Sequence, residues 1–340
     1  MHLSAAIHLA GAAPRPYMAG VMRPLLLLLA TPLLATFAPL SMRETPVSPA
    51  RPTVWAEPVQ LREDAPGERK LGRLTFLGGW WLRSDHPEFG GISAMHVENG
   101  AVLALTDAGR VLRFPIPARR GRAPLGLMPL PDTAGVAKTQ RDTEAMAIAD
   151  DHAWIAFERR NAVHRYRLPG WTLDASARPE AMKAWSQNSG GEAMIRLRDG
   201  RFLLFREGGS DAAGATEVIL LSGDPALPGT RATAMRYRAP PGYRITDAAE
   251  LTDGRLLFLN RRVGFPEGFS VKLTMAAPPT LRAGELLQGE EIASFASPVT
   301  TDNYEALSVT REGGSTIVWI ASDDNFIDLE RTLLMKFALD

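Results

Sequence analysis

The sequence contains no cysteine, and histidine is scarce. The missing thiols exclude disulfide bonds, thiolate metal ligands, cysteine nucleophiles and a lipoprotein anchor. After residue 42 the only histidines are His86, His96, His152 and His164. They do not show the His-Glu-x-x-His spacing of a zinc peptidase. These absences leave carboxylates, amides and arginines as the groups that could carry chemistry.

The chain also has no excess of charge of either sign. It carries 38 basic and 38 acidic residues among 340, for a formal net charge of zero. The arginines are spread along the chain, whereas a protein that binds nucleic acid needs a basic stripe to neutralise phosphates. We therefore expect no nucleic-acid partner.

Nucleophile and phosphate-binding motifs are absent as well. The stretch Gly91–Met95 reads Gly-Ile-Ser-Ala-Met and lacks the second glycine of a serine-hydrolase elbow. The glycine pairs, such as Gly190-Gly191 and Gly208-Gly209, do not open a helix and are typical of turns and bulges. A serine–histidine hydrolase and a dinucleotide-binding protein are both poorly supported.

Long helical patterns are missing, and short apolar runs take their place. Runs of four to seven residues alternate with hairpin dipeptides, including Asn99-Gly100, Asp199-Gly200 and Asp253-Gly254. Such dipeptides are strong signals for tight turns between antiparallel strands. The sequence therefore predicts an all-β fold.

A weak repeat predicts how the strands are arranged. Similar positions fall at Met95, Met146, Met194, Leu251 and Leu307, separated by 51, 48, 57 and 56 residues. About four strands in each period of roughly 50 residues is the arithmetic of a β-propeller blade. We predict six blades, with five as the alternative count and a pair of β-sandwiches as the competing fold. Residues 332–337 should pair with the strand around 71–78 and close the ring.

Three segments are expected along the chain. Residues 1–42 hold Arg23 followed by an apolar run, the layout of an export signal or an uncleaved N-terminal anchor. Residues 43–70 are rich in proline and charge and predict a linker with an edge strand near 53–58. Residues 71–340 form the propeller domain. We expect an exported, periplasmic monomer that meets a membrane only through an uncleaved N-terminus.

Acidic residues recur at matching places in the repeat. Glu144, Glu192 and Glu305 each precede a small residue and then an apolar one, and Glu250 directly precedes the apolar Leu251. A second set of charged residues follows 14 or 15 positions later in several repeats, as in Glu158 after Glu144 and Glu207 after Glu192. Because the innermost strands of a propeller line its channel, the acids should converge and repel one another unless a cation or arginines compensate them. A structural role, with the acids joining blade to blade, is the alternative.

Several motifs carry a resemblance to a known family. They are Phe-Gly-Gly-Ile-Ser-Ala at 89–94, Asp-Thr-Glu-Ala-Met at 142–146, Asn-Ser-Gly-Gly-Glu-Ala at 188–193, Asp-Asn-Tyr-Glu-Ala-Leu at 302–307 and Ser-Asp-Asp-Asn-Phe at 322–326. In this order the motifs resemble the bacterial phytase-like family, described as having esterase-like activity of phytase. The resemblance covers residues 71–339. It implies a β-propeller and an exported hydrolase of phosphoric or other esters, acting on a small anionic or ester substrate.

The repeat and the resemblance together suggest roles for ten residues. In propeller phytases, clustered carboxylates hold Ca²⁺ near the substrate phosphate, and by analogy a cation such as Ca²⁺ would be bound here by Glu144, Glu192, Glu305 and Asp323. A water-positioning base is expected among Asp107, Glu158 and Glu207. An anionic substrate would be received by Arg159, Arg206 and Arg261. A non-catalytic ligand- or partner-binding propeller and a lactonase-like propeller are the alternative functions.

Overall fold

The computed structural model describes residues 48–133, 135, 137, 140–186 and 190–340. The expected export signal at residues 1–42 lies outside these residues. No helix within the described part is long and apolar enough to cross a membrane. The regular structure of the described residues is almost entirely β-strand, as the sequence predicts, with two short 3-10 helices, η1 (Pro131–Thr133) and η3 (Glu180–Met182).

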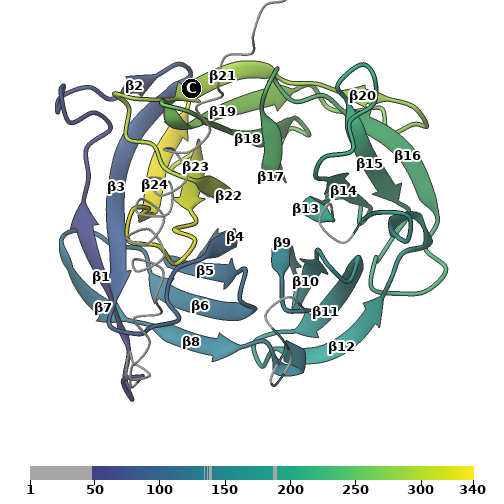
Figure 1. Cartoon of the computed structure of the whole chain (residues 1–340), viewed down its shortest axis with the longest axis horizontal. Coiled ribbons are helices and arrows are strands. Elements are labelled where there is room, and N and C mark those ends of the chain that lie inside the picture. The colour runs from purple at the N-terminus through teal and green to yellow at the C-terminus, as the bar shows by residue number, and fades with distance from the viewer. Residues whose placement is uncertain (1–47, 134, 136, 138–139, 187–189) are drawn as a thin grey trace, which may run out of the picture. The chain divides into compact units, whose positions relative to one another are not determined.

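Five antiparallel sheets make up residues 48–340, and each is a blade of a propeller (Figure 1). Five is the smaller of the two blade counts expected, and six blades are not confirmed. The strands of the first four blades are as follows. Blade 1 is β4 (Ile92–Glu98), β5 (Ala101–Thr106), β6 (Arg110–Pro115) and β8 (Gly126–Pro129); blade 2 is β9 (Thr143–Ala149), β10 (His152–Phe157), β11 (Ala162–Arg167) and β12 (Thr172–Ala177); blade 3 is β13 (Gly191–Arg196), β14 (Phe202–Arg206), β15 (Thr216–Leu221) and β16 (Ala232–Tyr237), with β20 (Leu286–Leu287) added in parallel; blade 4 is β17 (Arg244–Glu250), β18 (Leu256–Gly264), β19 (Gly268–Ala276) and β21 (Glu290–Phe295).

Blade 5 takes strands from both ends of this unit. Its members are β22 (Tyr304–Glu312), β23 (Ser315–Ser322), β24 (Thr332–Leu339) and β3 (Leu74–Ser84), extended outward by β1 (Thr53–Pro58) and β7 (Gly121–Pro124), with β2 (Lys70–Leu71) beside β3. β24 pairs with β3 in antiparallel register, for example Phe337 with Phe76. The predicted closure of the ring by the C-terminal run is confirmed. A strand does form near 53–58, as β1, but it lies between β3 and β7 and is not the edge strand expected.

Turn chemistry sets the hairpins that the dipeptides predict. Asn99 and Gly100 connect β4 to β5 with φ of 51° and 74°. Two successive positive φ values define the type I′ turn, whose twist matches that of the flanking strands. Gly313 and Gly314 connect β22 to β23 in the same way, with φ of 54° and 85°.

Hydrophobic packing is divided among the five junctions between neighbouring blades. Each junction holds one cluster of buried side chains, contributed by the facing sides of two sheets. Trp154, for example, packs between blades 2 and 3, and Trp319 between blades 5 and 1. Since each blade packs against two neighbours, we expect the ring to unfold as one cooperative unit.

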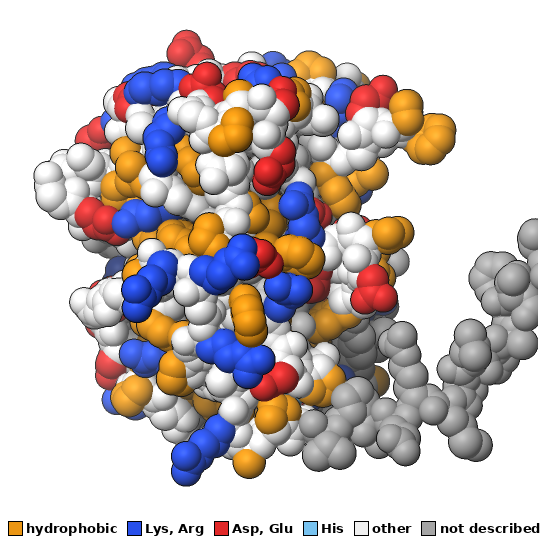
Figure 2. All heavy atoms as spheres, turned by 90° about the vertical axis from the view of Figure 1, so that its left-hand side faces the viewer, with side chains coloured by type: hydrophobic (Ala, Val, Ile, Leu, Met, Phe, Trp, Pro, Cys, Tyr) orange, Lys and Arg blue, Asp and Glu red, His pale blue; other side chains and the backbone are white. Residues whose placement is uncertain are grey.

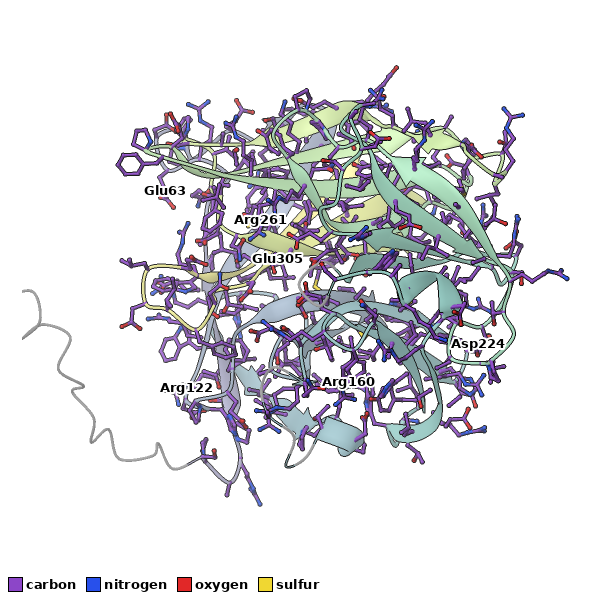
Figure 3. All side chains as sticks on the ribbon, turned by 45° about the vertical axis from the view of Figure 1, so that its right-hand side comes forward. Glu63, Arg122, Arg160, Asp224, Arg261 and Glu305 are labelled. Carbon is purple, nitrogen blue, oxygen red and sulfur yellow. The ribbon has the colours of Figure 1, made fainter. Side chains whose placement is uncertain are left out.

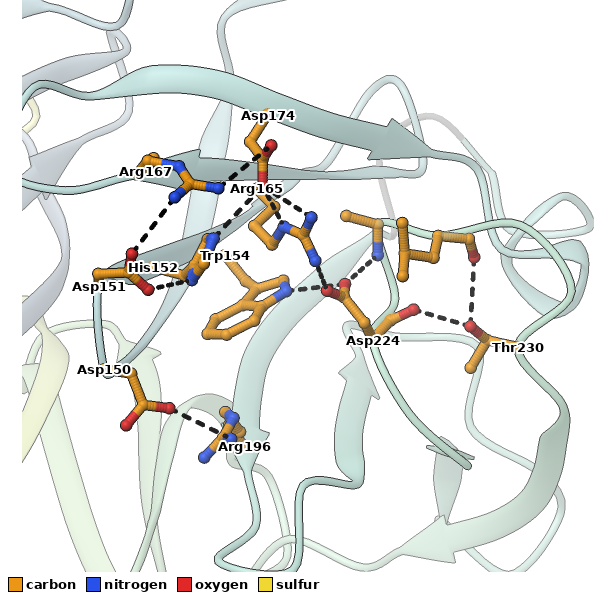
Figure 4. Close-up of polar contacts among 12 residues, drawn as sticks. Asp150, Asp151, His152, Trp154, Arg165, Arg167, Asp174, Arg196, Asp224 and Thr230 are labelled. Carbon is orange, nitrogen blue, oxygen red and sulfur yellow. Dashed lines mark hydrogen bonds and ion pairs between the residues drawn. The ribbon is translucent and has the colours of Figure 1, made fainter.

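Polar contacts supplement this packing at the junction of blades 2 and 3. The Trp154 indole N–H donates to the Asp224 carboxylate at 2.8 Å, and the Arg165 guanidinium pairs with the same carboxylate (Figure 4). On the outer side of blade 5, basic, acidic and hydrophobic side chains lie interspersed (Figure 2). That mixture agrees with the scattered arginines of the sequence.

Candidate functional site

The innermost strands β4, β9, β13, β17 and β22 surround the centre of the ring, each in contact with two others (Figure 1). Each of them has a β-bulge at the same place, where one residue drops out of the ladder with the second strand of its blade. A bulge bends the strand and re-aims the extra side chain. The five bulged residues are Ser93, Glu144, Glu192, Thr246 and Glu305.

This pattern corrects one sequence expectation. Thr246, and not Glu250, is the blade 4 equivalent of Glu144 and Glu192. Glu250 lies at the other end of β17, opposite Leu256, where it accepts a hydrogen bond from the Arg198 backbone N–H at 2.9 Å. In blade 4 the glutamate that precedes an apolar residue, Glu250 before Leu251, lies four positions after the bulged Thr246.

The two bulged hydroxyls have a structural role. Ser93 donates to the backbone carbonyl of Thr143 at 2.7 Å, and Thr246 donates to that of Tyr304 at 3.3 Å. Each bond joins a blade to the next one. The alternative expectation was that the acids join blade to blade. It is met at Glu305, which pairs with Arg261 of blade 4, and at Glu250, which accepts from Arg198 of blade 3.

A second ring position follows the second strand of each blade. In four blades its backbone N–H donates to the carbonyl of the residue two places before the bulge, at 2.9 to 3.0 Å. In blade 4 the same place is taken by Arg261, opposite Arg244 in the ladder. The five residues of this position are Asp107, Glu158, Glu207, Arg261 and Asp323. Every residue predicted for the site except Arg159 and Arg206 thus occupies one of two ring positions at one end of the channel.

Carboxylates gather most tightly between blades 2 and 3. Asp142, Glu144 and Glu158 form one group in which the carboxylate oxygens lie within 4.8 Å of one another. Glu158, Glu192 and Glu207 form a second such group. We call these two groups the carboxylate triads; they share Glu158. The backbone at Gly190 packs against Glu158 so closely that a Cβ there would lie 2.7 Å from the Glu158 Cα and Cγ.

The protonation of the triads reflects this crowding. Burial first, and then the neighbouring carboxylates, raise the pKa of Glu144 and of Glu192 well above the usual value. Burial, with Asp142 and Glu207, raises the pKa of Glu158 to about 7. Like charges held this close disfavour ionisation in the absence of a compensating cation.

Glu305 and Asp323, predicted as metal ligands, lie in a different electrostatic setting. The Arg261 guanidinium is 2.7 Å from the Glu305 carboxylate, as Figure 3 shows, and it also donates to the Asn303 amide oxygen. Burial raises the pKa of Glu305, and Arg261 opposes that rise. Burial and then Glu305 raise the pKa of Asp323 to about 8. Neither residue belongs to a carboxylate triad within the described residues.

The predicted arginines divide in the same way. Arg159 donates to Asp142 at 2.8 Å and lines a cavity of about 470 Å³ with Arg160 and Arg178. Arg206 lies against Gly209 and lines a separate cavity of about 510 Å³ with Arg244. Arg261 belongs to the ring itself. Arg159 and Arg206 therefore flank the triads on two sides, and Arg261 neutralises a ring carboxylate.

The sequence analysis missed three members of this arrangement. Asp142, Arg244 and Asn303 share the position two residues before the bulge. Asp142 stands within the Asp-Thr-Glu-Ala-Met motif, which was a usable signal. Arg244 contacts the Glu207 carboxylate at 3.3 Å, a pairing between blades 4 and 3 that strand patterns cannot give.

The chemistry of the donors fits a hard divalent cation. All five side chains of the carboxylate triads offer oxygen, the donor atom that Ca²⁺ prefers, and Ca²⁺ accepts six to eight such ligands in flexible geometry. A cation bound there would offset the repulsion that raises the pKa values. Nitrogen or sulfur ligands, which softer metals favour, are absent from both triads.

Comparison with known proteins gives a family match over most of the ring. Residues 87–326 match the family described as "Phytase-like: Esterase-like activity of phytase". No curated protein matches the sequence. Among solved structures, similar ones include an α-L-arabinofuranosidase from Clostridium thermocellum (12% identity, 67% of this chain and 80% of that chain, TM-score 0.44). Glutaminyl cyclase from Myxococcus xanthus is similar at 11% identity over 80% of this chain and 100% of that chain, with a TM-score of 0.45.

Proposed function

Because the chain belongs to the phytase-like family, described by esterase-like activity of phytase, we propose that it is a cation-dependent hydrolase of small ester or phosphoester substrates. The observation that carries this proposal is the pair of carboxylate triads sharing Glu158 at one end of the channel. A structural set of acids would be paired with arginines or backbone N–H groups, as Glu305 and Glu250 are. In the triads, arginines pair with Asp142 and Glu207, and the other three acids, Glu144, Glu158 and Glu192, have raised pKa values.

We assign the cation to Asp142, Glu144, Glu158, Glu192 and Glu207. When bound, Ca²⁺ would polarise an ester or phosphoryl oxygen and stabilise negative charge in the transition state. Glu305 and Asp323, expected as ligands from the sequence, lie outside both triads. We propose that their carboxylates contribute negative charge around the cation without binding it. The ion pair with Arg261 holds Glu305 in place.

The remaining roles follow from position. Asp107 is the predicted base that lies outside both triads, so it is left to position the attacking water, while Glu158 and Glu207 serve the cation. Arg159 and Arg206 flank the triads and would bind an anionic substrate through charge-assisted hydrogen bonds. Arg261 is a positioning residue that acts through Glu305.

Metal analysis and thermal shift test the cation. The purified protein should bind about one Ca²⁺, because the two triads share Glu158 and one Ca²⁺ accepts six to eight oxygen ligands. EDTA should then lower the melting temperature of the protein. Absence of any Ca²⁺ effect on melting would contradict the proposal. Ca²⁺ binding without hydrolysis of p-nitrophenyl phosphate, p-nitrophenyl acetate or a lactone would favour a non-catalytic binding propeller. Turnover of the lactone alone would favour a lactonase-like enzyme.

A double variant tests the residues. Glu144→Ala with Glu192→Ala should abolish both hydrolysis and the Ca²⁺ shift while leaving the protein folded. The matched control is Glu312→Ala, which removes an exposed acid paired with Lys336 on blade 5. A large loss of stability with activity intact would make the glutamates structural.

Export to the periplasm, and action there as a monomer, are part of the proposal. Export rests on the apolar run after Arg23. Cell fractionation of the full chain, followed by size-exclusion chromatography of the exported protein, tests both statements. Recovery in the cytoplasmic fraction would overturn the first, and a stable dimer the second.

A further inference from the structure

A further cavity lies between blades 1 and 2, away from the carboxylate triads. It has a volume of about 460 Å³ and is lined by residues at the Glu98 end of β4. The bulged Ser93 marks the channel end of the same strand. Five residues of strand separate the two, which is about 17 Å at 3.3–3.4 Å per residue. This cavity is therefore distinct from the proposed hydrolytic site.

The register of blade 1 explains why the cavity exists. In one row across the sheet, His96 is opposite Leu103, Leu103 opposite Arg113, and Arg113 opposite Gly126. Residues opposite one another in a ladder present their side chains on the same face. The neighbouring row, with Ala94, Leu105 and Val111, is buried against blade 2. At the His96 row, glycine contributes no side chain and the two sheets enclose a space.

The opposite wall comes from blade 2. Ile148, Leu168 and Trp171 line it, and Trp171 is almost fully buried. Trp171 has a φ of 53°. A left-handed conformation is a genuine outlier for so bulky a residue and costs on the order of 1–3 kcal/mol. Strain of this kind persists where the surroundings hold the side chain in place, and here it places an indole against a cavity.

Two polar side chains in the lining have no partner in the described part of the chain. Neither the Arg113 guanidinium nor the His96 imidazole makes a hydrogen bond or an ion pair with residues 48–133, 135, 137, 140–186 or 190–340. Burial lowers the pKa of His96, against the opposing effect of Glu98. The imidazole is then neutral at pH 7 and can still donate or accept a hydrogen bond.

Two acids, Asp150 and Glu98, also line the cavity. Asp150 contacts the Arg196 guanidinium at 3.8 Å (Figure 4). Glu98, which is exposed as Arg113 is, lies two residues beyond His96, about 7 Å further along the strand. Arg113 is thus the charge closest to the apolar row formed with Leu103.

We propose that this cavity binds a small aromatic or branched aliphatic carboxylate. The apolar body of the ligand lies between Leu103 and Trp171, and its carboxylate receives hydrogen bonds from Arg113. A largely apolar pocket of a few hundred Å³ with a small number of polar groups is the usual form of a small-molecule site. A guanidinium provides the planar, two-pronged donor that a carboxylate fits.

Isothermal titration calorimetry with three matched probes tests the proposal on the full chain. The probes are 1-naphthylacetate, the neutral 2-(1-naphthyl)ethanol and the cationic 2-(1-naphthyl)ethylamine. The acid should bind about tenfold more tightly than the alcohol, the factor that corresponds to 1.4 kcal/mol. Arg113→Gln should remove that difference. Tightest binding of the amine would mean that Glu98 decides the ligand and would overturn the proposal, as would equal binding of all three or no binding.

Substitutions of two glycines test the location. A Cβ at Gly126 would meet only Arg113 backbone oxygen and Cβ, at 3.5 and 3.6 Å, so Gly126→Leu can fill the cavity without a backbone clash. It should abolish binding of 1-naphthylacetate. The control, Gly121→Leu, adds the same side chain at a strand position with open space and should leave binding unchanged. Undiminished binding to Gly126→Leu would place the ligand elsewhere. Glu144→Gln with Glu192→Gln should bind the probe normally, which separates this proposal from that of the hydrolytic site.

Discussion

Arg261 and Glu305 form an ion pair across the junction of blades 4 and 5, with 2.7 Å between guanidinium and carboxylate. Arg261 occupies the ring position that is acidic in every other blade. Glu305 occupies the bulge position that it shares with Glu144 and Glu192. The single arginine in this ring of acids therefore distinguishes two parts of the site. At blades 4 and 5 Arg261 pairs with Glu305, and at blades 2 and 3 lie the carboxylate triads.

The first prediction concerns this pair. Arg261→Gln should destabilise the protein by about 1–3 kcal/mol, because it leaves Glu305 partly buried without its partner. Glu305→Gln in the same background should restore most of the loss. A double-mutant cycle from urea unfolding measures the coupling. The pair of Lys183 and Glu180, with side chains 54% and 86% exposed, is the control and should show a coupling below about 1 kcal/mol. Equal coupling in the two pairs would contradict the prediction.

The second prediction uses the close approach at Gly190. Gly190→Ala should displace Glu158, since the new Cβ would lie 2.7 Å from two of its atoms. As Glu158 belongs to both carboxylate triads, the dissociation constant for Ca²⁺ should rise about tenfold, or 1.4 kcal/mol. Calorimetric titration measures it. Gly223→Ala, at a glycine with open space around it, is the control. An unchanged Ca²⁺ affinity in Gly190→Ala would remove Glu158 from the cation site.

The third prediction is a pH dependence of stability from Asp247. This carboxyl is 7% exposed, and burial raises its pKa to about 8, although it accepts backbone hydrogen bonds from Ala248 and Leu307. Between pH 4 and pH 8 the unfolded chain has lost this proton while the folded one keeps it. Stability must then fall as pH rises, by about 1.4 kcal/mol per pH unit from this group.

Asp247→Asn, which cannot ionise, isolates that contribution. The slope of the unfolding free energy against pH should become less negative by about 1.4 kcal/mol per unit between pH 5 and pH 7, where only the unfolded chain is ionised. Urea unfolding at pH 5, 6 and 7 gives the slopes. The comparison depends on slopes alone, so a constant penalty from the lost backbone hydrogen bond does not affect it. Identical slopes in the two proteins would show that Asp247 is ionised in the folded state.

The fourth prediction tests ring closure. Phe337 of β24 is fully buried and packs against Phe76 and Phe295, each with its ring centroid 5.6 Å away. Phe337→Ala should cost about 3–5 kcal/mol. Phe265→Ala, at a phenylalanine 98% exposed, should change stability by less than about 0.5 kcal/mol. Chemical denaturation of both variants checks the contrast, and a small effect at Phe337 would mean that β24 is dispensable.

The all-β class, the ring closure and the glutamates of three blades could be predicted from sequence, because strand runs, turn dipeptides and the Glu-small-apolar pattern are local signals. Blade 4 shows where such signals end. Thr246 and Glu144 are the bulged residues of their strands, yet one has a hydroxyl and the other a carboxylate. Glu250, four residues after Thr246, is the acid that the sequence pattern selected instead. The bulge that defines the place is a property of pairing, which the sequence of one strand does not contain.

The separation of the Arg261–Glu305 pair from the carboxylate triads could not be predicted from the sequence, for a related reason. Arg261 looked like a substrate ligand because it follows an apolar strand beside other charges. Its pairing with Glu305 depends on which blades are neighbours and on the length of β18. The blade count stayed open between six and five in the sequence, even though the pairing that places β3 in the sheet of β22 to β24 was predicted.

The pairing of β24 with β3 also has a consequence during protein synthesis. β24 follows every other strand of the ring along the chain, so a nascent chain carries β3 and β23 with unpaired edges until β24 has emerged. Free strand edges are templates for aggregation. The junction between blades 4 and 5 cannot be completed earlier, because β24 supplies part of its core. Folding intermediates of this protein should therefore depend on chaperones that shield strand edges, up to the moment when the last strand docks.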